Sequence, residues 1–197
     1  TAPRRMAFFV TARGVTNEVY YMAQKAARFL GTNHVDNAAR LCHAPSGVAM
    51  KEMLGVAAST CGYSDWIGSD VVVFFGSNPA NDQPVSTKYL LLARRRGTRV
   101  VLVNPYNEPA MQRYRVPTDS RSALFGSDLA TDWFAVRPGG DIALIYGALK
   151  HLLAHGGIDT AFVEAHTTGF AALRERVESL DWAELEASAG LPRARIE

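Results

Sequence analysis

Val71-Val-Val-Phe-Phe75 is the clearest secondary-structure signal in the sequence, and Gly76-Ser-Asn-Pro79 follows it directly. Five β-branched and aromatic residues without a polar interruption are typical of a β-strand. A helix is predicted next, over residues 84–96, because proline favours the first turn and Gly97 lies just past the end. This stretch therefore predicts one strand–helix unit of a parallel sheet.

The same alternation of short apolar runs and longer helical stretches continues on both sides of this unit. Residues 104–130 are predicted as a long loop, and 158–197 as a peripheral helical segment. We therefore expect the α/β fold class, with a Rossmann-like parallel sheet of about four core strands and helices on both faces. The other predicted strands are 6–10, 99–103 and 133–136, and the other predicted helices are 17–30, a helix from about 46, and 141–155.

Length favours a single α/β domain over residues 1–197, with two small domains as the less favoured alternative. The chain is 48% hydrophobic and 20% charged, which is ordinary for a globular protein. The net charge is +2, and the basic run at residues 94–96 closes a predicted helix, where positive charge is favourable. No basic stripe and no apolar run of about 20 residues is present, so neither nucleic acid nor a membrane is an expected partner.

The two cysteines, Cys42 and Cys61, are too few for a disulfide framework and lack the CxxC spacing of a zinc or iron–sulfur site. Because few cysteines indicate a protein of a reducing compartment, we expect a cytoplasmic protein. Arg4-Arg5 suggests a twin-arginine export signal, but the apolar stretch after it is too short. The chain begins without methionine and stops just after Pro192 opens a predicted helix, so we expect an internal piece of a longer polypeptide.

Glycine, asparagine and aspartate follow the predicted strands, where ligands of parallel α/β sheets bind. Gly76-Ser77-Asn78 and Asp82 follow the second strand, Asn104-Pro105 the third, and Gly140-Asp141 the fourth, while residues 11–14 follow the first. Free amides at helix N-termini attract phosphate, and the polar side chains can bind a ribose or a base. Each loop alone is equally typical of an ordinary turn. Four such loops favour a nucleotide site, although the missing GxGxxG pattern argues against an NAD domain.

The segment from Asn33 to Ser46, which contains Cys42-His43-Ala-Pro-Ser46, resembles the metal-ligand segment of molybdopterin-dependent formate dehydrogenases. Four further stretches resemble motifs of the same family, the bis-molybdopterin guanine dinucleotide oxidoreductases, in the same order. They are Thr16-Asn-Glu18, the Gly-x-Asn-Pro loop at 76–79, Val103-Asn-Pro-Tyr106, and Gly139-Gly-Asp-Ile-Ala-Leu144. The resemblance extends from about residue 8 to residue 170. The Cys-His-Ala-Pro-Ser sequence is most similar to that of formate-dehydrogenase-like alpha subunits.

This resemblance implies a molybdenum-dependent oxidoreductase with Mo-bis(molybdopterin guanine dinucleotide) as cofactor. Cys42 would be the metal ligand, because a thiolate is a soft ligand, and His43 would accept the proton released when a substrate such as formate is oxidised. One guanine dinucleotide arm would lie on the strand-end loops. Their implied cofactor-binding residues are Gly76, Ser77, Asn78, Asp82, Val103, Asn104, Pro105, Gly140 and Asp141.

The resemblance also implies a larger protein. The partners would be the remaining domains of the parent chain and a small-molecule substrate, possibly formate, and a [4Fe-4S] cluster is possible in the parent protein outside this chain. The isolated 197 residues are expected to be inactive. The substrate, the electron acceptor, the oligomeric state and the choice between molybdenum and tungsten stay open.

The sequence departs from the family pattern at Asn104 and Tyr106, which replace an acid and an arginine. Tyrosine cannot form the bidentate contacts of arginine, so guanosine contacts at this turn are in doubt. Two alternatives remain. One is a nucleotide-binding domain with a sensor or assembly role, in which Cys42 is only a packing residue. The other, less favoured, is a cysteine hydrolase that uses Cys42 and His43, although adjacent residues seldom have the geometry of a nucleophile and its base.

Overall fold

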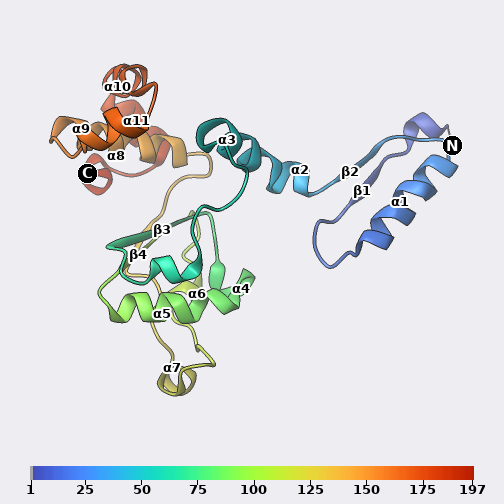
Figure 1. The fold of residues 1–197 in the computed structure, drawn as a ribbon, viewed down its shortest axis with the longest axis horizontal. Coiled ribbons are helices and arrows are strands. Elements are labelled where there is room, and N and C mark those ends of the chain that lie inside the picture. The colour runs from blue at the N-terminus through green and yellow to red at the C-terminus, as the bar shows by residue number, and fades with distance from the viewer. Residues whose placement is uncertain (1) are drawn as a thin grey trace. The chain divides into compact units, whose positions relative to one another are not determined.

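The computed structural model describes residues 2–197 (Figure 1). The chain divides into two compact units, Thr1–Cys61 and Gly62–Glu197. Each unit has its own parallel sheet. The sequence predicted a single domain, and the joining of the two units into one domain stays a prediction.

The first unit is a small strand–helix–strand arrangement. β1 (Phe8–Val10) and β2 (Val35–Asn37) pair in parallel, with Phe8 opposite Val35. α1 (Asn17–Phe29) connects them, as the apolar periodicity predicted. After β2 come two helices separated by a break, α2 (Ala39–Cys42) and α3 (Ala44–Leu54).

The second unit contains a three-stranded parallel sheet with the order β3-β4-β5. The strands are β3 (Val71–Phe75), β4 (Arg99–Val103) and β5 (Asp132–Phe134). Short helices join them: η2 (Tyr63–Trp66) precedes β3, while α4 (Pro79–Asp82), η3 (Pro84–Ser86), α5 (Thr87–Arg95), α6 (Pro109–Gln112) and α7 (Ser120–Phe125) lie between strands. After β5 come α8 (Asp141–Ala154), α9 (Thr160–His166), α10 (Phe170–Glu178), α11 (Trp182–Ala189) and α12 (Arg193–Ile196).

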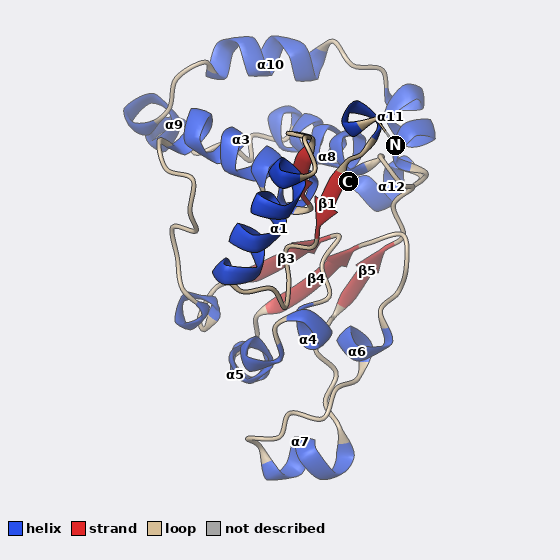
Figure 2. Cartoon of the chain, turned by 90° about the vertical axis from the view of Figure 1, so that its right-hand side faces the viewer, coloured by secondary structure: helices blue, strands red, loops and turns tan. Residues whose placement is uncertain are grey.

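The central strand β4 supplies side chains to two cores, one on each face of the sheet. Val100 and Leu102 pack into a cluster with residues of α5 and α6, such as Leu90 and Met111. The alternate residues of the strand pack instead against α8, α11 and α12. Figure 2 shows these two groups of helices on opposite sides of the sheet. An α/β fold with parallel sheets and helices on both faces, as expected from the sequence, is therefore confirmed.

The strand count and the arrangement of the strands differ from the prediction. About four strands in one sheet were expected, whereas residues 2–197 form five strands in two sheets. The sequence pattern missed β2 because Asp36 and Asn37, two of its three residues, are polar. β5 ends at Phe134 and not at Val136, because the amide of Val136 turns back to the carbonyl of Phe134.

The segment 158–197 is helical as expected, but its last helices are not peripheral. Leu185 and Ala189 of α11 and Ile196 of α12 are buried in the same core as Val101 and Val103. The loop at 104–130 contains α6 and α7, where at most one helical turn was expected. Within residues 2–197, none of the helices combines the length and the apolar character that crossing a bilayer requires.

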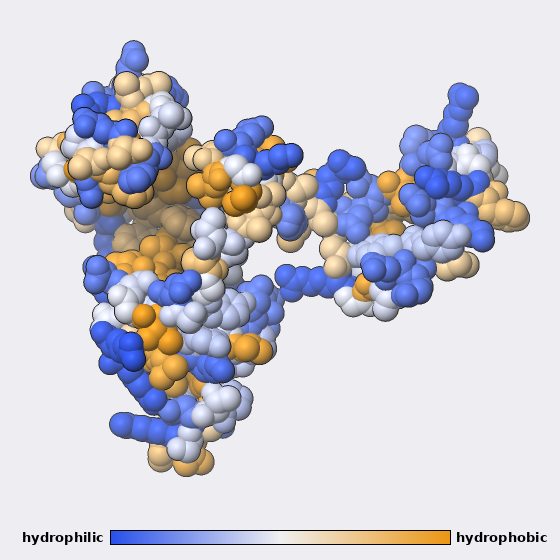
Figure 3. Space-filling model, viewed as in Figure 1, coloured by the Kyte–Doolittle hydropathy of each residue, from blue (hydrophilic) through white to orange (hydrophobic). Residues whose placement is uncertain are grey.

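Apolar side chains remain exposed in both units, and Figure 3 shows them as orange areas between polar residues. Phe29 is 89% exposed and Met53 is 82% exposed in the first unit. In the second unit, Val71, Val73 and Phe75 of β3 are between 44% and 47% exposed. Surface of this kind is common where a further part of a protein binds.

Asp132 gives the second unit an acid-sensitive link between β5 and β4. Hydrogen bonds from the side chains of Thr131 and Arg99 lower the pKa of Asp132, and Arg99 Nη2 lies 3.1 Å from its carboxylate. A lowered native pKa means that the carboxylate stabilises the fold above about pH 3.9, the unfolded value, and that this stability is lost as the pH falls through the native pKa.

We therefore expect Asp132→Asn to lower the urea midpoint by about 0.3 M at pH 7, the size typical of one partly exposed ion pair. The difference from wild type should disappear as the pH falls through the lowered native pKa of Asp132, because the protonated side chain and asparagine are then both neutral. Urea titrations between pH 7 and pH 2 would measure it. A difference that stays constant over this range would contradict an ionic origin.

Candidate cofactor-binding site

Cys42 and His43 lie at the break between α2 and α3 in the first unit. Cys42 is the last residue of α2, and its amide donates to the carbonyl of Ala38 at 3.1 Å. The imidazole of His43 lies beside Gly47, at whose position a Cβ atom would be 3.4 Å from Cε1 and 3.6 Å from Nδ1 of the ring. Both side chains are exposed. The thiol of Cys42 is therefore accessible to a ligand and does not fill a core.

Cys42 does not belong to a cluster of metal-binding side chains in the described part of the chain. No group of three or more His, Cys, Asp or Glu side chains that could hold a metal exists among residues 2–197. A metal held at Cys42 would therefore need most of its ligands from a cofactor. A metal that arrives already bound to dithiolene sulfurs fits such a site, since it needs only one further soft ligand.

The loops of the second unit are joined along the carboxyl edge of the three-stranded sheet. The amide of Gly76 donates to the carbonyl of Val103 at 2.8 Å, and the amide of Asn104 donates to the carbonyl of Phe134 at 3.1 Å. Trp133 Nε1 also donates to the carbonyl of Asn104, at 2.7 Å. Three strand ends are therefore brought together on one edge. The loop at 11–14, which the sequence placed with them, follows β1 in the other sheet.

The loop after β3 combines an open backbone position with a fixed asparagine. Gly76 has φ +58°, and no atom lies within 4 Å of the position of a Cβ atom, so a ligand can approach the backbone closely. Asn78 caps α4 by accepting from the amide of Asn81 at 3.3 Å. Its Nδ2 donates to Oε2 of Glu108 at 2.8 Å. Ser77 is half-buried and Asp82 is exposed in the same loop.

Glu108 is a residue of this edge that the sequence analysis missed. It precedes α6, thirty positions after Asn78, and connects the loop after β4 with the loop after β3. The one sequence signal for it is its place directly before Pro109 at a helix start, which is too common to single it out. Its carboxylate fixes the amide of Asn78, so it orients a predicted cofactor-binding residue.

The loop after β4 offers backbone groups and one amide side chain. Val103 is 3% exposed, so its side chain belongs to the core and only its backbone faces the loop. Oδ1 of Asn104 accepts from the amide of Tyr106 at 3.1 Å. Nδ2 of Asn104 makes no hydrogen bond within the described part of the chain and is available as a donor. Pro105 and Tyr106 are exposed.

The loop after β5 is held by contact with α11. Gly140 is buried, and a Cβ atom there would lie 2.6 Å from the carbonyl oxygen of Ser188 and 3.0 Å from Cα of Ala189. Gly139, in contrast, has φ +82° and open space around it. Asp141 begins α8, whose first amides point toward this loop. Gly140 thus sets the close packing of the loop, and contact of Gly140 with a cofactor stays a prediction.

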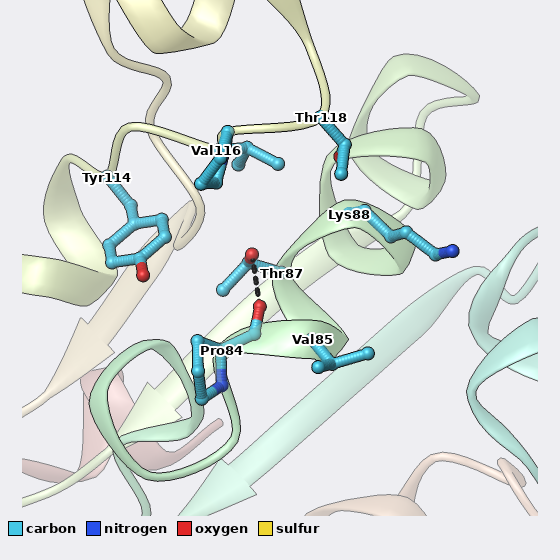
Figure 4. A pocket seen from close by; sticks show the side chains of 8 residues that line it. Pro84, Val85, Thr87, Lys88, Tyr114, Val116 and Thr118 are labelled. Atoms are coloured by element: carbon cyan, nitrogen blue, oxygen red, sulfur yellow. Dashed lines mark hydrogen bonds between the residues drawn. The ribbon is translucent and has the colours of Figure 1, made fainter.

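A pocket of about 270 Å³ lies elsewhere on the second unit, between the start of α5 and the chain before α7 (Figure 4). The hydroxyl of Thr87 donates to the carbonyl of Pro84 at 2.6 Å on one side of it. No residue predicted from the sequence to bind the cofactor lines this pocket. Its lining residues are Pro84, Val85, Thr87, Lys88, Tyr114, Val116, Pro117 and Thr118.

Comparisons with known proteins identify the family of the chain. The family model described as molybdopterin oxidoreductase matches residues 1–160. The chain is 29% identical to Protein YdeP of Escherichia coli over 98% of its own length. It is also 29% identical to a formate dehydrogenase alpha subunit of Methanococcus maripaludis, over 99% of its length, and to formate dehydrogenase H of Escherichia coli, over 94%.

The chain spans 27%, 26% and 24% of the lengths of these three relatives, so it matches about a quarter of each. The family match, by contrast, covers most of the chain, including both units' strand-end loops and the Cys-His segment. The chain therefore belongs to the molybdopterin oxidoreductase family.

Proposed function

We propose that this chain is part of a molybdenum-dependent oxidoreductase that performs a formate-dehydrogenase-like two-electron oxidation. The observation that carries the proposal is the joined carboxyl edge of β3, β4 and β5, where three polar loops meet in a chain of this family. Relatives named formate dehydrogenase support the reaction class. When bound, Mo-bis(molybdopterin guanine dinucleotide) supplies the redox step.

Cys42 is the proposed metal ligand and His43 the proposed proton acceptor. The exposed thiol of Cys42 can coordinate as a thiolate, which suits a metal already bound to sulfur. Oxidation of formate yields carbon dioxide, two electrons and one proton. The ring of His43 has its Nδ1 side against Gly47, so Nε2 is the atom proposed to take that proton.

The strand-end loops of the second unit are proposed to hold one guanine dinucleotide arm. Gly76 leaves room for phosphate beside the backbone, and Nδ2 of Asn104 can donate to a ribose or base oxygen. Val103 and Pro105 can contribute backbone only. The other residues proposed to contact this arm are Ser77, Asn78, Asp82, Gly140 and Asp141.

The activity is proposed for a larger cytoplasmic protein, with the 197 residues inactive by themselves. The exposed apolar side chains of β3 and α3 are then surface that other domains of that protein contact. A [4Fe-4S] cluster outside this chain is the proposed route for the electrons. Neither nucleic acid nor a membrane is a proposed partner.

The test is the metal and nucleotide content of the complete protein. Purified protein should contain about one molybdenum or tungsten atom by mass spectrometry, and should release about two GMP per chain on acid hydrolysis. The same protein made in cells that cannot synthesise the cofactor is the control and should contain neither. GMP without metal would favour the nucleotide-binding alternative, and absence of both from cofactor-competent cells would reject the proposal.

A further inference from the structure

Four arginine side chains meet at a second pocket on Gly62–Glu197. The pocket has a volume of about 320 Å³ and is mostly polar. Two of its arginines, Arg94 and Arg95, end α5, and the other two come from the chain around α7. Its lining residues are Leu91, Arg94, Arg95, Arg113, Arg121, Gly126, Ser127 and Asp128.

Hydrogen bonds hold two of these arginines in place. Arg95 Nη1 lies 2.8 Å from Oδ2 of Asp119, the residue that caps α7. Arg113 Nη2 donates to the carbonyl of Phe125 at 2.6 Å. Gly126 has φ +74°, and a Cβ atom there would be 3.0 Å from Nε of Arg113, so glycine leaves the space that this side chain uses. The pocket is therefore a built feature and not a chance meeting of mobile side chains.

The charges of the pocket are not balanced by its own carboxylates. Asp119 pairs with Arg95, and Asp128 is the one carboxylate among the lining residues. Four guanidinium groups thus face two carboxylates, which leaves an excess of two positive charges. In addition, Nε of Arg94 is buried and has no hydrogen-bond partner within residues 2–197. A buried donor without a partner is unfavourable, and a small shift of the Arg94 side chain toward an acceptor in the pocket would satisfy it.

This pocket is separate from the candidate cofactor loops. Arg94 and Arg95 lie at the end of α5, which leads into the first residue of β4, so they are near the amino edge of the sheet. The chain around α7 returns to the same edge, where the amide of Thr131 donates to the carbonyl of Val100 at 2.7 Å just before β5 begins. The cofactor loops leave the opposite, carboxyl edge.

We propose that this arginine pocket binds a tetrahedral dianion, namely free inorganic phosphate. Guanidinium groups pair with phosphate oxygens through two parallel hydrogen bonds, which makes these contacts strong and fixes their geometry. A dianion matches the excess of two positive charges and offers acceptors to Nε of Arg94. The interpretation from sequence alone, that this basic run only closes a helix, explains Arg94 and Arg95 but not Arg113 and Arg121.

The test is equilibrium dialysis of the full chain against radiolabelled inorganic phosphate at low ionic strength. Wild type should bind about one phosphate saturably, and Arg121→Gln should weaken binding about tenfold, since it removes one charged donor. The side chain of Arg121 makes no hydrogen bond to the rest of residues 2–197, so this variant should fold normally. Arg113→Gln is the second variant and should show a similar loss.

Arg115→Gln is the matched control, because Arg115 is exposed, lies between the same two strands and does not line the pocket. Binding by this variant should stay within twofold of wild type. Sulfate should compete with phosphate, and chloride at equal ionic strength should not. No saturable phosphate binding by wild type, equal losses in all three variants, or equal displacement by chloride would each overturn the proposal.

Discussion

Replacing Cys42 by serine in the complete protein is expected to lower formate-dependent dye reduction on the order of 1,000-fold, because a hydroxyl is a poor ligand for a metal that binds soft sulfur. This result depends on the proposed function. Turnover should be measured together with metal content per chain, so that loss of the metal is distinguished from an inactive bound metal.

Cys61→Ser is the matched control for this prediction. Cys61 is also a free, exposed cysteine of the first unit, and no family motif includes it. Its replacement should leave the rate within twofold of wild type. If Cys42→Ser kept wild-type turnover, Cys42 would not be the ligand. Equal losses in both variants would indicate general damage to the unit.

Replacing Gly140 by alanine is expected to destabilise the second unit by about 2–3 kcal/mol, as overpacking of a close backbone contact usually does. The new Cβ atom would lie 2.6 Å from the carbonyl oxygen of Ser188. A backbone atom cannot rotate away as a side chain can, so α11 would have to separate from the loop after β5. Urea or thermal unfolding of the full chain would measure the loss.

Gly62→Ala is the control, since Gly62 has φ −102° and its nearest neighbour would be 3.8 Å from the new Cβ atom. Its stability should change by less than about 0.5 kcal/mol, the usual range for an uncrowded surface substitution. Equal stabilities of Gly140→Ala and wild type would show that α11 does not pack as closely as described.

The parts of the fold that could be predicted are those with strong local patterns. β3 and β4 have the predicted limits, because each contains four or more consecutive apolar residues with polar residues or glycine on either side. α8 begins at the predicted Asp141, directly after a glycine pair. β2 could not be predicted, because its polar residues are made a strand only by pairing with β1. The secondary structure of such a segment is determined by its tertiary contacts and not by the local propensity of its residues.

In the candidate site, too, some features could be predicted from the sequence and others depend on contacts between distant residues. That the loops after β3, β4 and β5 would meet at one edge follows from parallel topology and could be predicted. The contact of Asn78 with Glu108 could not, since it joins residues thirty positions apart. Nor could the packing role of Gly140, which depends on α11, almost fifty residues later in the chain.

Tyr114 and Ser127 form an isolated antiparallel bridge, each amide donating to the other residue's carbonyl at 2.8–2.9 Å. The two ends of the segment between them lie close together. The entropy of closing such a loop changes little with its length, so a change in the length of this segment has a small effect on stability. Insertions and deletions are therefore tolerated there more readily than in the cofactor loops. Arg121, one of the four arginines of the pocket, lies in this segment, so a change in the segment's length would alter the proposed anion site without altering the cofactor loops.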